Sequence, residues 1–241
     1  MGRTFENRKH AILKRGARDS KAFTRCGRQI SMAVKSGGGD PDTNPALRRA
    51  MQNASAANMS KEKVKNAIDK ALKLGDTSNF EQVLYEGYGP HGVAMIVDTA
   101  TDNPTRTVAN VRSAFKKGLG NLGNTGSVSF MFDQSGVFKL KPEGIERDEL
   151  ELELIDHGLE ELADAENDKG EAQLLVRCTR ENFGTMQTAL EAQEINVESS
   201  GFEWIPQTLT ELTDEQVDDV LKLIARLDDD DDVQEVFHTL A

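Results

Sequence analysis

The sequence predicts an α+β protein with an N-terminal all-helical bundle and two α/β-sandwich-like domains, one of them ferredoxin-like and inserted in the other. Capped helical patterns fill the first third of the 241 residues, strand and helix patterns alternate after residue 92, and the order βαββαβ occupies residues 134–204. We therefore expect a basic helical domain at residues 1–78, a discontinuous α/β domain at residues 79–133 plus 205–241, and the inserted domain at residues 134–204.

The first third of the chain predicts four helical stretches. A weak basic pattern from Phe5 to Arg18 is expected to become ordered on a partner, and a clearer helix runs from Lys21 to Lys35. Asn44-Pro45 and Ser60 begin two more helices by capping, and the last is expected to end at Gly75. In the helix from Lys21 to Lys35 the apolar side chains share one face, and the basic ones lie opposite. The apolar set is Phe23, Cys26, Ile30, Ala33 and Val34.

The middle of the chain predicts a strand, a helix and a returning strand. The apolar run from Val93 to Val97 is typical of a buried strand, and Asn103-Pro104 caps and starts the next helix. Gly118 is expected to close that helix in a left-handed conformation. The returning strand is expected to pass through Val128, Phe130 and Phe132.

Residues 134–204 predict the ferredoxin-like order, which RNA-recognition modules share. The segment is net acidic, and the strand around Val176 lacks the aromatic residues that stack bases, so we interpret it as an interaction or spacer domain. A helix capped by Thr213 and a strand from Val233 to Phe237 follow, and we expect them to complete the sheet that begins at Val93.

Several motifs resemble those of the YebC/PmpR family. They are Tyr85-Glu86-Gly87-Tyr88-Gly89-Pro90, Thr101-Asp102-Asn103, Arg106-Thr107-Val108, Gly120-Asn121-Leu122-Gly123 and the aspartate run at residues 228–232. At the N-terminus this chain has Gly2-Arg3-Thr4-Phe5 where the family usually has Gly-His-Ser-Lys-Trp, so it resembles a divergent subgroup. The resemblance implies the same three-domain plan and a transcriptional regulator that binds DNA. Relatives also suggest a translation factor that contacts ribosomal RNA.

Charge is strongly segregated along the chain. Residues 1–75 hold 17 of the 29 basic and 6 of the 41 acidic residues, a net charge of +11, which leaves −23 on the remainder. A merely solvated helix surface would interleave acids with bases, yet none occurs between Lys21 and Lys35. This pattern favours nucleic-acid phosphates as the partner. The candidate binding residues are Lys21, Arg25, Arg28, Lys35, Arg48, Arg49, Lys61, Lys65 and Arg106.

Three other motifs have competing interpretations. The run Gly118–Gly123 matches G-x-G-x-x-G but follows a helix, so it predicts a turn rather than a dinucleotide site. The helix start at Thr101–Thr107 fits a phosphate and a simple capping loop about equally. The acidic run Asp228–Asp232 lacks calcium-loop spacing, which favours a solvated loop, with self-shielding or another binding role as the alternative.

The remaining composition excludes several classes of protein. Cys26 and Cys178 are far apart and predict buried reduced thiols, and neither they nor the four histidines have metal-ligand spacing. No apolar run is long enough for a membrane span, which favours a cytoplasmic protein. No catalytic residues, metal or cofactor are predicted, and the oligomeric state stays open.

We therefore expect a non-enzymatic nucleic-acid-binding protein, with a DNA-binding transcriptional regulator as the first hypothesis. A translation factor bound to ribosomal RNA is the main alternative, because phosphates alone do not distinguish DNA from RNA. A ligand-binding or enzymatic protein that uses a cleft between domains is the third. Substitution of Lys21, Arg25 and Arg28 is expected to leave the bundle folded.

Overall fold

The protein is described by a computed structural model, which covers residues 2–73, 79–167 and 170–241, with side chains from Ser20 onward. Helices and two four-stranded sheets make up these residues, which confirms the α+β class. The contacts divide the chain into two compact units. One comprises residues 1–84, 97–114 and 224–236, and the other residues 85–96, 115–223 and 237–241. The division into three domains stays a prediction.

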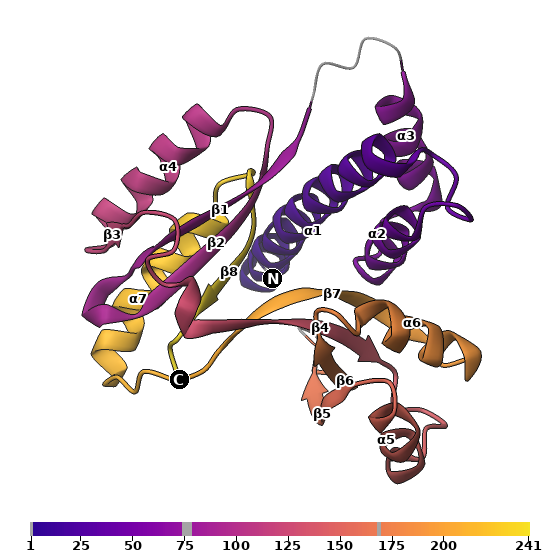
Figure 1. The fold of residues 1–241 in the computed structure, drawn as a ribbon. Helices are drawn as coiled ribbons and strands as arrows, with labels where there is room; N and C mark the ends of the chain where they lie inside the picture. The colour runs from indigo at the N-terminus through magenta and orange to yellow at the C-terminus, as the bar shows by residue number, and fades with distance from the viewer. Residues whose placement is uncertain (1, 74–78, 168–169) are drawn as a thin grey trace. The chain divides into compact units, whose positions relative to one another are not determined.

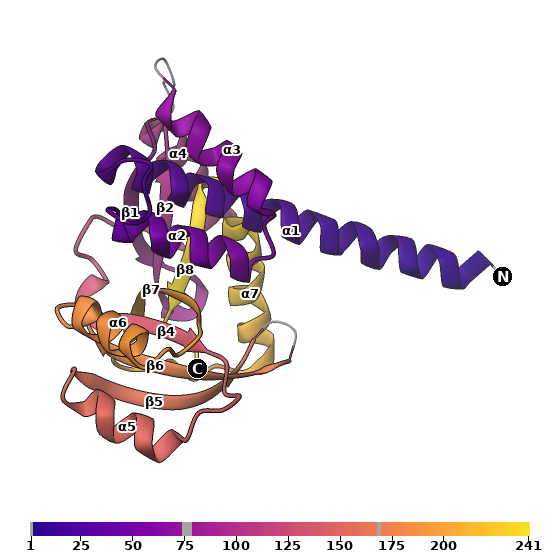
Figure 2. The ribbon, with the colours of Figure 1, turned by 90° about the vertical axis from the view of Figure 1, so that its right-hand side faces the viewer.

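The N-terminal segment forms one helix, α1 (Gly2–Gly37), where the sequence indicated two (Figure 2). Gly16 and Gly27 do not interrupt it, because an interior glycine costs only ~1 kcal/mol and the neighbouring residues are good helix formers. The apolar face of α1 packs against α2 (Pro45–Ala56) and α3 (Lys61–Leu72), which confirms a helical bundle. The buried core residues are Cys26, Ile30, Ala33, Val34, Leu47, Ala50, Ala54 and Val64.

The predicted helix starts of the bundle are confirmed. The Asn44 side chain accepts a hydrogen bond from Leu47 N at 3.1 Å, and Ser60 Oγ accepts one from Lys63 N at 3.4 Å. The helix end expected at Gly75 lies outside the described residues. Phe23, which the periodicity placed with the apolar set, is only half-buried, with Lys63 Nζ 4.3 Å from its ring centre.

The first sheet has the strand order β3-β1-β2-β8 (Figure 1). Its strands are β1 (Glu81–Tyr88), β2 (Ala94–Thr101), β3 (Asn121–Leu122) and β8 (Val233–His238). The position of β8 beside β2 confirms that the C-terminal strand completes this sheet. Helix α4 (Pro104–Lys117) follows β2, and α7 (Asp214–Asp228) precedes β8. β1 was not predicted, because its first residues are exposed and a buried glutamate interrupts its apolar pattern.

That buried glutamate, Glu86, shapes the loop before β4. Its carboxylate accepts hydrogen bonds from the backbone N–H groups of Gly126, Val128 and Ser129, each at 2.8 Å. Burial alone would raise the pKa of Glu86, but these donors outweigh it and the pKa is lowered. The strand expected from Val128 is therefore wrong: the carboxylate binds amides that a ladder would need, and a 3₁₀ turn at Ser129–Met131 takes its place.

The end of α4 also differs from the prediction. The left-handed residue is Leu119, with φ 59°, and not Gly118. Gly118 is needed for a different reason: a Cβ there would lie 2.8 Å from Leu223 Cδ1, closer than packed carbons approach. The run Gly118–Gly123 follows α4 and contains the short strand β3, which is the arrangement of a helix-to-strand connection.

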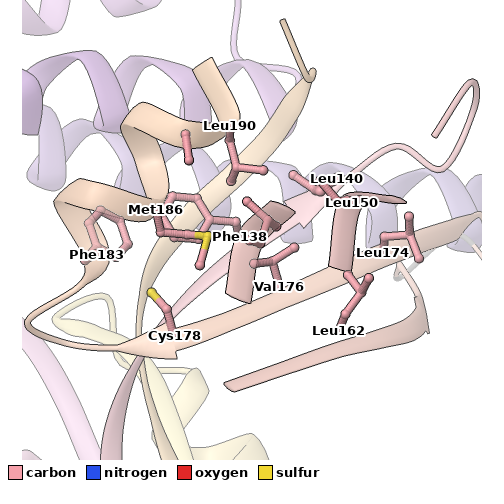
Figure 3. Packing of buried hydrophobic residues seen from close by; sticks show 12 residues of the cluster. Phe138, Leu140, Leu150, Leu162, Leu174, Val176, Cys178, Phe183, Met186 and Leu190 are labelled. Atoms are coloured by element: carbon pink, nitrogen blue, oxygen red, sulfur yellow. The ribbon is translucent and has the colours of Figure 1, made fainter. Parts of the chain in front are cut away.

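The second sheet confirms the ferredoxin-like order, with antiparallel neighbours arranged β5-β6-β4-β7. The elements are β4 (Phe132–Leu140), α5 (Arg147–Ile155), β5 (Leu159–Glu166), β6 (Ala172–Thr179), α6 (Phe183–Ala192) and β7 (Val197–Pro206). Side chains of β4 and β6 pack against both helices, with Phe138 stacked on Phe183 at 4.6 Å (Figure 3). The opposite face carries ion pairs such as Arg177–Glu161.

Both cysteines are buried free thiols, as the sequence predicted. Burial raises the pKa of Cys178 to about 11 and also raises the pKa of Cys26. None of the helices in the described ranges combines the length and apolarity that a membrane crossing requires.

Candidate nucleic-acid interface

The basic face of α1 lies opposite its buried stripe, as the periodicity predicts. Lys21, Arg25 and Arg28 are spaced four and three residues apart, so their side chains leave the helix on the same side. No acid lies on α1 between Lys21 and Lys35. The counter-charges come instead from residues Asp228–Asp232, hereafter the acidic segment, which connects α7 to β8.

The acidic segment pairs with this face residue by residue. Lys21 Nζ lies 2.5 Å from Asp229 Oδ1, and Arg25 Nη2 lies 3.1 Å from Asp228 Oδ1. Arg25 Nε also donates to the carbonyl oxygen of Val233 at 3.0 Å. The basic face predicted to bind phosphates is therefore covered, in this structure, by carboxylates of the same chain.

Asp232 is the centre of a second, more buried cluster. Arg28 Nη1 donates to Asp232 Oδ1 at 2.7 Å, and Arg106 Nη2 donates to Oδ2 at 2.8 Å. The hydroxyl of Thr107 donates to the same Oδ2 at 2.6 Å. Arg28 Nη1 also lies 2.6 Å from the carbonyl oxygen of Ala100, so two segments far from α1 in sequence hold its guanidinium.

The start of α4 explains why a carboxylate is stable at this position. The side chain of Asn103 accepts a hydrogen bond from Arg106 N at 3.1 Å, which confirms the predicted cap. Asp232 meets this helix start through side chains of its first turn, since Arg106 Nη2 and the Thr107 hydroxyl both donate to its carboxylate, and a negative charge near a helix N-terminus is favourable. The phosphate considered for this helix start has an internal counterpart, because Asp232 already lies there.

Electrostatics and burial together define Asp232 as an ionised anchor. Its side chain is only 4% exposed and that of Arg28 is 13% exposed. Burial alone would raise the pKa of Asp232, but hydrogen bonds from Thr107, Arg106 and Arg28 outweigh burial and lower the pKa. The solvated-loop interpretation of the acidic segment is therefore wrong at Asp232, since two arginines and a helix start surround this carboxylate.

The pairs at the other end of the acidic segment are much more exposed. The side chains of Lys21 and Asp229 are 38% and 77% exposed, and those of Arg25 and Asp228 are 30% and 46% exposed. Solvated ion pairs of this kind contribute about 0–1 kcal/mol each, whereas removing one partner of a buried pair costs about 3–5 kcal/mol. Arg28 thus contributes to the stability of this cluster, and its pairing with Asp232 argues against the expectation that a substitution including Arg28 leaves the bundle folded.

The other candidate residues lie elsewhere on the bundle. Lys35, near the end of α1, donates to Asn79 Oδ1 at 3.0 Å. On α2, Arg48 is exposed and Arg49 is half-buried; on α3, Lys61 and Lys65 are exposed. The structure therefore brings four of the nine candidates to the acidic segment and leaves the others spread along the helices.

Two features of the site were not predicted from the sequence. The first is the pairing of Arg28 with Asp232, although a run of acids after a helix C-terminus, where negative charge is unfavourable, was a usable signal. The second is Phe80, whose ring lies 5.1 Å from the Arg28 guanidinium carbon in a cation–π contact. Among the described residues, no three His, Cys, Asp or Glu side chains gather as metal ligands.

These observations define an α+β protein in which a basic helical bundle contacts an acidic segment from near the C-terminus. Comparison with known proteins specifies the family. The family model for the TACO1/YebC protein N-terminal domain matches residues 3–74, and that for the TACO1/YebC second and third domain matches residues 80–240. The chain therefore belongs to the TACO1/YebC family, which confirms the resemblance seen in the sequence.

Relatives and a solved structure extend this result along the whole chain. A probable transcriptional regulatory protein of Anaeromyxobacter dehalogenans strain 2CP-C is 54% identical over 241 residues, with 100% of both chains covered. Another, from Myxococcus xanthus strain DK1622, is 51% identical over the same length, again with 100% of both covered. The crystal structure of a conserved hypothetical protein from Aquifex aeolicus has a TM-score of 0.79 and 33% identity, covering 92% of this chain and 90% of that one.

Proposed function

We propose that this protein is a non-enzymatic regulator that binds nucleic acid through the basic surface of its helical bundle, with DNA as the first target. The observation that carries this proposal is the segregation of charge, with +11 on residues 1–75 and −23 on the remainder. A phosphate backbone would be attracted to the bundle and repelled by the rest of the chain. The relatives are named probable transcriptional regulatory proteins, which supports DNA as the target. The cytoplasm is the site of action that goes with this proposal.

Exposed lysines on α3 supply the most direct test. Lys61 and Lys65 are exposed at positions four residues apart, so both can contact one phosphate backbone. Changing both to Gln should weaken binding to all sequences about equally and reduce the slope of log affinity against log salt by roughly 1.8, at about 0.9 per phosphate contact on duplex DNA. Gln is a good helix former, so the bundle should stay folded.

The matched control is Lys141→Gln with Lys222→Gln, two exposed lysines of the acidic remainder, whose loss changes the net charge by the same amount. Fluorescence anisotropy of a labelled 20-base-pair DNA duplex, at several salt concentrations, measures both proteins. Equal weakening by the two pairs would move the site away from the bundle. The same titration is repeated with duplex RNA. Tighter binding to RNA than to DNA, together with recovery of the cellular protein with ribosomes rather than with promoter DNA, would favour the translation-factor alternative.

A further inference from the structure

We infer that the acidic segment acts as an internal competitor of nucleic acid: Asp228 and Asp229 cover Lys21 and Arg25 until a phosphate backbone displaces them, while Asp232 holds the segment in place. This inference rests on the proposed function, because it assigns a regulation to the same basic surface. It also divides the predicted basic face into two groups. Lys21 and Arg25 exchange the aspartates for phosphates, whereas Arg28 stays paired with Asp232.

The geometry distinguishes the two groups. Asp232 is anchored through its side chain by Arg28, Arg106 and Thr107, and its backbone carbonyl accepts a hydrogen bond from Ala100 N at 2.8 Å. A carboxylate that is 4% exposed is not replaced without opening this cluster.

The pairs made by Asp228 and Asp229 are of the opposite kind. Both reach solvent, and each places a carboxylate where a phosphate oxygen would bind: 2.5 Å from Lys21 Nζ, and 3.1 Å from Arg25 Nη2. Because solvent screens such pairs, a phosphate backbone that contacts several cations at once can replace them at small cost. Asp230 does not take part, since its Oδ2 accepts a hydrogen bond from Asn110 Nδ2 at 2.9 Å.

The test removes the competitor without touching the cations. Changing Asp228 and Asp229 to Asn together should tighten binding of a labelled 20-base-pair DNA duplex by roughly 3- to 10-fold, given what exposed pairs contribute. If the freed Lys21 and Arg25 then neutralise phosphates, the salt slope should also steepen by up to about 1.8. In a chain that already carries Lys21→Gln and Arg25→Gln, the same two aspartate changes should have no further effect.

A charge-matched variant separates a specific contact from a general field. Asp218 and Asp231 are exposed, and their joint change to Asn alters the net charge equally. Among the described residues, neither makes an ion pair with α1. If this control variant raises the affinity for DNA equally, or if the affinity still rises in the chain that lacks Lys21 and Arg25, the inference of an internal competitor is wrong. The proposal of nucleic-acid binding would then remain. Absence of binding by every variant, including the double Asn form, would overturn both proposals. Binding only after Asp228 and Asp229 are changed would support both.

Discussion

The buried pair between Asp232 and Arg28 allows the sharpest stability prediction. Changing Asp232 to Asn keeps its size but leaves the Arg28 guanidinium, 13% exposed, without its carboxylate. Stranding one partner of a buried pair costs about 3–5 kcal/mol. Arg28 keeps its hydrogen bond to Ala100, and Arg106, being 47% exposed, keeps Asp102 at 2.9 Å. We therefore expect a cost somewhat below that range, about 2–3 kcal/mol.

Hydrogen exchange is the suitable assay, because a chain with two compact units need not unfold in one step. Amides of residues 21–37 and 97–107 that exchange through opening of this cluster should do so roughly 30- to 150-fold faster, since 1.4 kcal/mol is a factor of about ten. The matched control is the neighbouring change Asp231→Asn, at an exposed position. It should alter the free energy of opening, as measured by exchange, by less than about 0.5 kcal/mol.

A second substitution tests whether the unpaired charge of Arg28 causes the loss of stability in Asp232→Asn. Adding Arg28→Met to Asp232→Asn removes the stranded charge and keeps a side chain of similar length, so the double variant should be more stable than Asp232→Asn alone. Exchange at wild-type rates in Asp232→Asn would refute the reasoning. So would a double variant that is less stable than either single one, because the cost would then come from lost packing rather than from an unpaired charge.

Two further predictions concern carboxylates with shifted pKa values. Burial raises the pKa of Asp98 to about 6, despite hydrogen bonds from Gln82. Folding therefore takes up a proton between about pH 4 and 6, and the stability of the fold falls as pH rises through this range. Changing Asp98 to Asn should add on the order of 1–3 kcal/mol to the free energy of unfolding at pH 7.5 and nothing near pH 4, as measured by thermal unfolding. A stabilisation that is equal at both pH values would contradict this. The pKa of Glu86 is lowered, so its contribution is present above about pH 4 and lost below; Glu86→Gln should cost about 2–3 kcal/mol at pH 7, and the difference should vanish in acid.

The sequence determined the parts of the fold that depend on neighbouring residues. The helix starts after Asn44, Ser60 and Asn103 were predicted correctly, because a cap satisfies amides only two or three residues away. The order βαββαβ was also predicted, because apolar periodicity is a property of each segment by itself. The basic face of α1 followed from the same periodicity.

Only the tertiary structure decided what that face contacts. Arg28 and Asp232 are 204 residues apart, and no local rule connects a base in the first helix to the last carboxylate of a run near the C-terminus. Strand β1 and the turn at Ser129–Met131 escaped prediction for the same reason, since Glu86 acts on amides about 40 residues away. Caps and periodicity act within a turn or two of backbone, whereas ion pairs and buried carboxylates depend on the path of the folded chain. The sequence by itself therefore determined the elements and their charge, and the fold decided which charges neutralise one another.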